Sequence, residues 1–242
     1  MEGLDLKRIL NVLTLEMKRK NFIKNKVISL VILIPILLLL LIMDKSTDIS
    51  SVVITTIPYI WLTSFCFSLT QEFENKTDKI IFTGIFSRSE IIISKLLSFC
   101  MMALVHFIFY EILVVIFSIY GGQGTSNLLN IKTLGNNLYA FLIYAFTIGS
   151  FILLVSACTT NGIFTGIITY VLYFDLVLAL LSQALWSSKN ETLKCVIRNS
   201  PFYNANMGFY HLKYNFNQSM VMLISGSIFL IATCIIINKK NI

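Results

Sequence analysis

Six long apolar runs, separated by polar or charged intervals, constrain most strongly what this chain can fold into. A helix needs about 20 predominantly apolar residues to cross the hydrocarbon core of a bilayer. Because that core offers backbone amides and carbonyls no partners, runs of this length form helices. The chain is also only 13% charged, against roughly 25% in soluble proteins. The sequence therefore predicts an all-α integral membrane protein with six transmembrane helices, expected at residues 27–43, 51–70, 96–120, 138–158, 163–181 and 219–237.

The basic residues predict the orientation of these spans. Thirteen of the 19 Lys and Arg residues lie before the first span, between the second and third, or after the sixth. Cytoplasmic loops carry an excess of such residues, so we expect a plasma-membrane protein with both chain ends in the cytoplasm. The net charge of +7 fits anionic lipid better than nucleic acid, because the basic residues flank apolar spans. Four of the other six lie between the fifth and sixth spans, a segment expected outside with the single acid Glu191, and these are Lys189, Lys194, Arg198 and Lys213.

Residues 1–26 carry an amphipathic helical pattern before the first span. Five apolar residues share one helical face while basic and polar residues occupy the other, and the apolar set is Leu6, Ile9, Leu10, Leu13 and Met17. A basic amphipathic helix of this kind lies in the plane of a membrane surface. The alternative is a helix that packs on protein.

The charged interval 71–95 contains signals for two helices. Gly84 can end a short helix, expected at about residues 74–83, because glycine accepts the left-handed conformation found after helix ends. Ser87 and Glu90 have the spacing of a capping box, in which each side chain bonds the other residue's backbone amide. The helix that starts there continues into the third span without a break. We therefore expect a short cytoplasmic helix held rigidly against a membrane-spanning one.

Two further polar stretches connect the later spans. Residues 159–162 read TTNG and predict a compact helix break between the fourth and fifth spans. Residues 182–218 are rich in aromatic side chains, which favour the membrane interface. We expect one or two short helices there, lying at or dipping into the outer leaflet. The Asn-Ser-Pro sequence at residues 199–201 predicts the break between them.

Two acids interrupt the apolar spans, Glu111 in the third and Asp175 in the fifth. An acid at the centre of a transmembrane helix costs about 2.5–3.5 kcal/mol on insertion scales, so each should face protein or water. Together with His106 they are candidates for a polar path or for recognition of a cationic substrate. The alternative for each is a structural hydrogen bond between helices.

The sequence carries no catalytic constellation. It contains no phosphate-binding loop, no paired-histidine zinc motif and no Gly-x-Ser-x-Gly turn. Its two histidines, His106 and His211, lie on opposite flanks of the apolar region, which leaves a Ser/His/Asp triad unsupported. Its five cysteines show neither a disulfide framework nor zinc-ligand spacing. We expect a chain that is not an enzyme and binds no cofactor or metal itself, so uphill transport would need an energy source elsewhere.

The layout resembles the ABC-2 type permeases, the membrane subunits of ATP-binding-cassette exporters. The sharpest local similarity begins with Glu72 at the end of the second span and ends with Lys95 before the third. Between them, residues 82–91 read FTGIFSRSEI, where the family usually has a Leu-Thr-x-Pro-x-Ser-Arg-x-Glu run followed by Gly-Lys. This chain lacks the proline, and Ser94 replaces the glycine before Lys95. The rest of the resemblance covers almost the whole chain and is one of topology.

The resemblance implies a coupling helix, at about residues 74–83, that docks on a separate ATPase subunit, with residues 159–162 as a second, smaller contact. The coupling residues it implies are Glu72, Glu74, Asn75, Lys76, Asp78, Lys79, Phe82, Gly84, Ser87, Arg88, Glu90, Thr160 and Asn161. ATP and Mg would bind in that partner. The resemblance also implies a second membrane subunit, identical or homologous. By analogy it extends to permeases that export bacteriocins, lantibiotics and other hydrophobic or amphipathic peptides.

Two other classes of function stay open at this point. An ion-coupled secondary carrier would use Glu111 and Asp175 and would need no ATPase. Against it, the two halves of the chain show no interrupted helices in matching positions, the usual sign of a carrier site. A non-transporting membrane anchor or sensor would leave the capped helix pair at residues 71–95 unexplained.

Overall fold

The computed structural model of the chain describes residues 5–18, 49–74, 86–120 and 130–240. Within these ranges every regular element is a helix, which confirms the all-α prediction. The predicted first span, at 27–43, lies outside the described residues. The helices are α1 (Leu6–Lys18), α3 (Ile49–Phe65), α4 (Phe67–Glu74), α6 (Arg88–Tyr120), α7 (Ile131–Thr159), α8 (Gly162–Tyr173), α9 (Asp175–Ser187), α10 (Glu191–Arg198), α11 (Pro201–Tyr210) and α12 (Phe216–Lys239).

Four helical segments in the described part of the chain are long and apolar enough to cross a membrane. The first, Ser51–Glu74, consists of most of α3 together with α4. The others are Arg88–Ile116 within α6 and the whole of α7 and α12. These correspond to the predicted second, third, fourth and sixth spans. Both α6 and α7 begin well before the predicted spans, because a polar cap starts each helix ahead of its apolar run. In α7 that cap is Asn130, whose side chain accepts from the backbone N–H of Lys132 at 3.0 Å.

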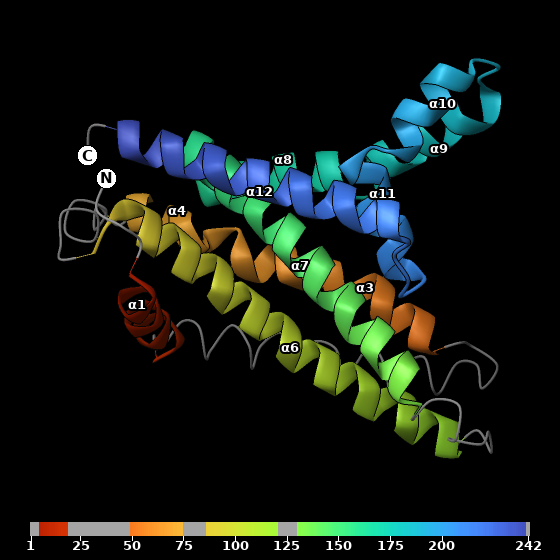
Figure 1. Cartoon of the computed structure of the whole chain (residues 1–242), viewed down its shortest axis with the longest axis horizontal. Helices are drawn as coiled ribbons and strands as arrows, with labels where there is room; N and C mark the ends of the chain where they lie inside the picture. The colour runs from red at the N-terminus through yellow and green to blue at the C-terminus, as the bar shows by residue number, and fades with distance from the viewer. Residues whose placement is uncertain (1–4, 19–48, 75–85, 121–129, 241–242) are drawn as a thin grey trace.

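The central helix of the bundle is α7. It packs against both α12 and α6 (Figure 1). Most of its apolar length is buried, whereas only a minor share of theirs is. Aromatic rings fill the core around it. Trp61 of α3 meets Phe99 of α6 edge to face at 5.4 Å between ring centroids, and Tyr144 of α7 stacks on Phe209 of α11 at 4.4 Å. Such pairs add about 0.5–1.5 kcal/mol each beyond the area they bury.

The predicted fifth span, 163–181, is wrong as a single helix. It is divided into α8 and α9 at Phe174, which has an extended backbone with φ −115° and ψ −152°. The amide of Asn206, in α11, donates to the carbonyl of Tyr173, and the Asn206 carbonyl oxygen accepts from the hydroxyl of Tyr144 at 3.1 Å. A tertiary contact thus satisfies a carbonyl at the break. Apolar residues continue on both sides of Phe174, so hydropathy alone does not reveal the interruption.

The interval 182–218 begins with the end of α9 and contains two short helices, α10 and α11, in agreement with the predicted number. The predicted break at 199–201 is confirmed, since α10 ends at Arg198 and α11 begins with Pro201 in its first turn, a position that suits proline. In Figure 1, α9 and α10 project away from the bundle. By contrast, α11 packs against α7 and α12, and its Phe209 is fully buried. The location of these helices at an outer leaflet stays a prediction.

The N-terminal helix α1 packs against α6, which favours the alternative of a helix on protein. Its Ile9 and Val12 are buried. Two other residues of the predicted apolar face, Leu6 and Leu10, are 71% and 48% exposed. Only part of that face is therefore covered by the bundle, and contact of the remainder with lipid stays a prediction.

Candidate functional site

The last turn of α4 touches three different parts of the fold. This turn consists of Glu72, Phe73 and Glu74 and is called the α4 terminus from here on. It follows α3 after a turn at Cys66, and it leads directly into the segment predicted to form the coupling helix. The end of α4, the start of α6 and the end of α12 lie at the same end of the bundle, on the left of Figure 1.

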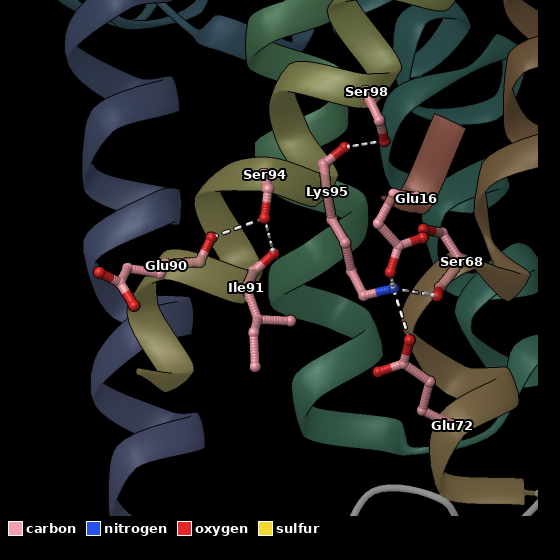
Figure 2. A network of polar contacts seen from close by, with 8 residues as sticks. All are labelled: Glu16, Ser68, Glu72, Glu90, Ile91, Ser94, Lys95 and Ser98. Atoms are coloured by element: carbon pink, nitrogen blue, oxygen red, sulfur yellow. Dashed lines mark hydrogen bonds and ion pairs between the residues drawn. The ribbon is translucent and has the colours of Figure 1, made fainter. Parts of the chain in front are cut away.

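Glu72 forms a buried ion pair with Lys95 of α6. The Lys95 Nζ lies 2.6 Å from Oε1 of Glu72, 3.1 Å from Oε1 of Glu16 in α1, and 3.0 Å from the carbonyl oxygen of Ser68 in α4 (Figure 2). These three acceptors match the three hydrogens of an ammonium group. Because burying an unpaired ammonium would be costly, the contacts fix α1, α4 and α6 relative to one another.

Glu74 reaches the turn that precedes α8. Its Oε1 accepts from the backbone N–H of Gly162, the first residue of α8, at 2.9 Å. A carboxylate there is stabilised by the free amides and positive dipole end of the helix. A Cβ on Gly162 would lie 2.3 Å from the ring of Phe67, so the close approach of α4 to α8 requires glycine.

The turn at residues 159–162 has the compact form predicted for it. Thr160 takes the left-handed conformation, with φ 54°, and its backbone N–H bonds the carbonyl of Ser156. The side chain of Asn161 then caps α8 by accepting from the backbone amides of Ile163 and Phe164, at 2.9 and 3.2 Å. Both predicted coupling residues in this turn thus end one helix and begin the next.

The predicted capping box at the start of α6 is confirmed. The backbone N–H of Ser87 donates to Oε2 of Glu90 at 2.8 Å, and the N–H of Glu90 donates to the Ser87 hydroxyl at 3.2 Å. The Glu90 side chain is buried in the first turn of α6, where the positive end of the helix dipole favours a carboxylate.

Arg88, predicted as a coupling residue, is directed at the C-terminal end of α12. Its Nη1 donates to the carbonyl oxygens of Ile237 and Lys240, at 2.8 and 2.7 Å, and more distantly to that of Asn238, at 3.4 Å. Its half-buried guanidinium is thus occupied within the chain. The remaining predicted coupling residues lie outside the described part of the structure and are Asn75, Lys76, Asp78, Lys79, Phe82 and Gly84.

The candidates for a substrate path are not brought together by the contacts seen here. Glu111 of α6 is half-buried and accepts from the amide of Asn137 in α7 at 2.8 Å, which is the interhelical hydrogen bond expected as its alternative role. His106 is buried, with Nδ1 at 2.9 Å from the carbonyl oxygen of Met102. Asp175 is the first residue of α9, and its side chain lies outside the described part of the chain.

Sequence reasoning missed three members of this end of the bundle, namely Glu16, Lys95 as an ion-pair partner, and Lys240. A signal for one pair was present, since Glu72 ends one span and Lys95 begins the next at the same side of the predicted membrane.

Among the described residues, no group of three His, Cys, Asp or Glu side chains is placed to hold a metal ion. No protein-family model matches the chain, and none of the curated proteins matches it either.

Proposed function

We propose that this chain is the permease subunit of an ATP-driven exporter of the ABC-2 type. It works with separate ATPase subunits and with a second membrane subunit, identical or homologous. Its substrate is a hydrophobic or amphipathic peptide that passes between the two membrane subunits. The observation that carries the proposal is the hydrogen bond from the Gly162 amide to Glu74, because it joins the two regions that the resemblance assigns to ATPase contact.

The connections of the α4 terminus support this role. Segment 75–85 follows it directly, so a force applied there acts first on Glu72, Phe73 and Glu74. Glu72 passes the force to α6 and α1 through Lys95, and Glu74 passes it to α8 through Gly162. The Glu72–Lys95 contact is buried on both sides, and such close-packed contacts do not deform continuously, so a small displacement there moves whole helices.

The proposed permease crosses the membrane six times. The four long apolar helices account for four crossings. Residues 27–43 supply the first crossing, and α8 with α9 supplies an interrupted fifth. In this topology both chain ends lie in the cytoplasm. The α4 terminus, the start of α6 and the end of α12 lie at the cytoplasmic end of the bundle. Helices α9 to α11 lie at the outer side.

An ion-coupled carrier has less support. Glu111 accepts a hydrogen bond from Asn137 of α7, which is the structural role expected as its alternative, and no described contact joins it to a second acid. A role as a simple membrane anchor does not explain why the α4 terminus contacts three other elements. The chain therefore suits the transfer of force better than either alternative.

Co-purification tests the proposal. The tagged chain, expressed in its native host and extracted in mild detergent, should bring down an ATP-binding-cassette ATPase whose hydrolysis of Mg-ATP is faster in the complex than alone. Addition of a panel of amphipathic peptides should raise that rate further for at least one of them. Recovery of the chain without any ATPase would contradict the proposal.

A further inference from the structure

A single residue at the C-terminal end of α12 joins three other helix ends. Lys240 follows the last residue of α12, and its Nζ donates to the carbonyl oxygen of Ala157, in the last turn of α7, at 2.9 Å. The same ammonium lies 4.4 Å from the centroid of the Phe73 ring in the α4 terminus. The carbonyl oxygen of Lys240 accepts from Arg88, at the start of α6, at 2.7 Å.

These contacts place cations at the C-terminal ends of two helices. The last carbonyl groups of a helix have no partner within it and carry a partial negative charge. Arg88 of α6 meets the end of α12, and Lys240 meets the end of α7. Since each cation comes from a different element than the helix it caps, the contacts act as cross-links between helices.

The contact with Phe73 connects this cross-link to the α4 terminus. A cation over an aromatic face is attracted by the negative charge of the ring face, and more strongly where it is desolvated. The same ammonium also donates to Ala157, so it contacts both α4 and α7, which pack against each other. Lys240 thereby holds the end of α7 beside the α4 terminus. The end of α7 leads directly into the turn at residues 159–162.

We propose that Lys240 is a positioning residue for coupling, which holds the two regions predicted to meet the ATPase in a fixed relation. The inference rests on the proposed function and deepens it by making the C-terminal end of α12 a third part of the coupling apparatus. Displacement of the α4 terminus moves Phe73, and Lys240 transmits that motion to α7 by its side chain and to α6 by its backbone. Nothing else in the sequence marks this residue as different from its neighbour Lys239.

Lys239 supplies a matched control. It is exposed, it carries the same charge, and it is adjacent in the chain. The variants compared are Lys240→Ala, Lys239→Ala and Lys240→Arg, of which the last keeps a cation that can reach a carbonyl oxygen and stack on an aromatic ring.

The first measurement uses the chain alone in detergent and follows amide hydrogen exchange in peptides that cover residues 155–163. We expect Lys240→Ala to speed exchange there about tenfold, the factor that corresponds to the loss of one hydrogen bond from a charged group. Lys239→Ala and Lys240→Arg should exchange like the native chain. Equal exchange in the two alanine variants would overturn the anchoring of α7 by Lys240.

The second measurement uses the complex with its ATPase and follows the stimulation of Mg-ATP hydrolysis by the permease. We expect Lys240→Ala to bind the ATPase but to lose the stimulation, and Lys240→Arg to restore it. Unchanged stimulation in Lys240→Ala, alongside faster exchange at residues 155–163, would reduce Lys240 to a purely structural role and overturn the coupling inference. If the native chain binds no ATPase, the proposed function and this coupling role fail together, and hydrogen exchange alone decides the anchoring.

Discussion

The Nζ atom of Lys95 lies 2.6 Å from Oε1 of Glu72, and both side chains are completely buried. Glu16 of α1 provides a second acid to the same ammonium, and its side chain is 17% exposed. Three helices thus depend on one positive charge. Lys95 fixes the position of the α4 terminus from within the protein, at the point where the proposed coupling segment begins.

Replacement of Lys95 by methionine should destabilise the protein strongly. The variant leaves Glu72 buried without its counter-charge, and breaking a buried ion pair in this way costs about 3–5 kcal/mol. Thermal unfolding of the purified chain in detergent, followed by tryptophan fluorescence, measures the effect. Lys132→Met is the control, because Lys132 is exposed at the start of α7. The same Tm for both variants would contradict this view of Lys95.

A methyl group added at Gly162 should separate α8 from α4. Gly162→Ala places a Cβ 2.3 Å from the Phe67 ring, and such overpacking costs about 1–3 kcal/mol. Gly166→Ala is a matched control in the same helix, since its Cβ would meet only Cys66 Sγ, at 3.9 Å. We expect Gly162→Ala to have a lower Tm than the native chain. Gly166→Ala should have an unchanged or slightly higher Tm, because alanine favours the helix more than glycine does. The reverse order would refute the close approach.

The break between α8 and α9 should depend on Asn206. Asn206→Leu removes the donor to the Tyr173 carbonyl and the acceptor of the Tyr144 hydroxyl. Leaving buried polar groups unsatisfied costs about 1–3 kcal/mol each. Tyr144→Phe loses only the second bond and should cost less, because it removes its own hydroxyl and leaves the Tyr173 carbonyl satisfied. Equal losses of Tm in the two variants would show that the Asn206 amide does not support the break.

Much of the helical architecture was predictable, because long apolar runs and helix caps are local signals. The ends of α6 and α12, the turn at residues 159–162 and the break at 199–201 all follow from residue types close in sequence. The interruption at Phe174 was not predictable in this way. It is stabilised by Asn206, which lies in another helix, so the local sequence shows only an apolar run that contains one acid.

The candidate site was predictable in its position but not in its connections. The capping box at Ser87 and Glu90 fixed the start of α6, and the charged interval 71–95 indicated the coupling region. The pairs Lys95 with Glu16 and Lys240 with Ala157 join residues far apart in the chain. A single sequence contains no local pattern that specifies such pairs, because tertiary packing decides which helix ends meet.

The central claim is that the α4 terminus transmits force from an ATPase, and Glu74→Lys tests it most directly. This change places a cation at the positive N-terminal end of α8 and removes the acceptor of the Gly162 amide. Glu191→Lys is the control, since Glu191 is an exposed acid of α10 that pairs with Lys194. The measurement is the rate of Mg-ATP hydrolysis by the purified complex divided by the rate of the ATPase alone. We predict that this ratio falls to about one in Glu74→Lys while the ATPase stays bound, and that it keeps its native value in Glu191→Lys. A native ratio in Glu74→Lys would contradict the claim.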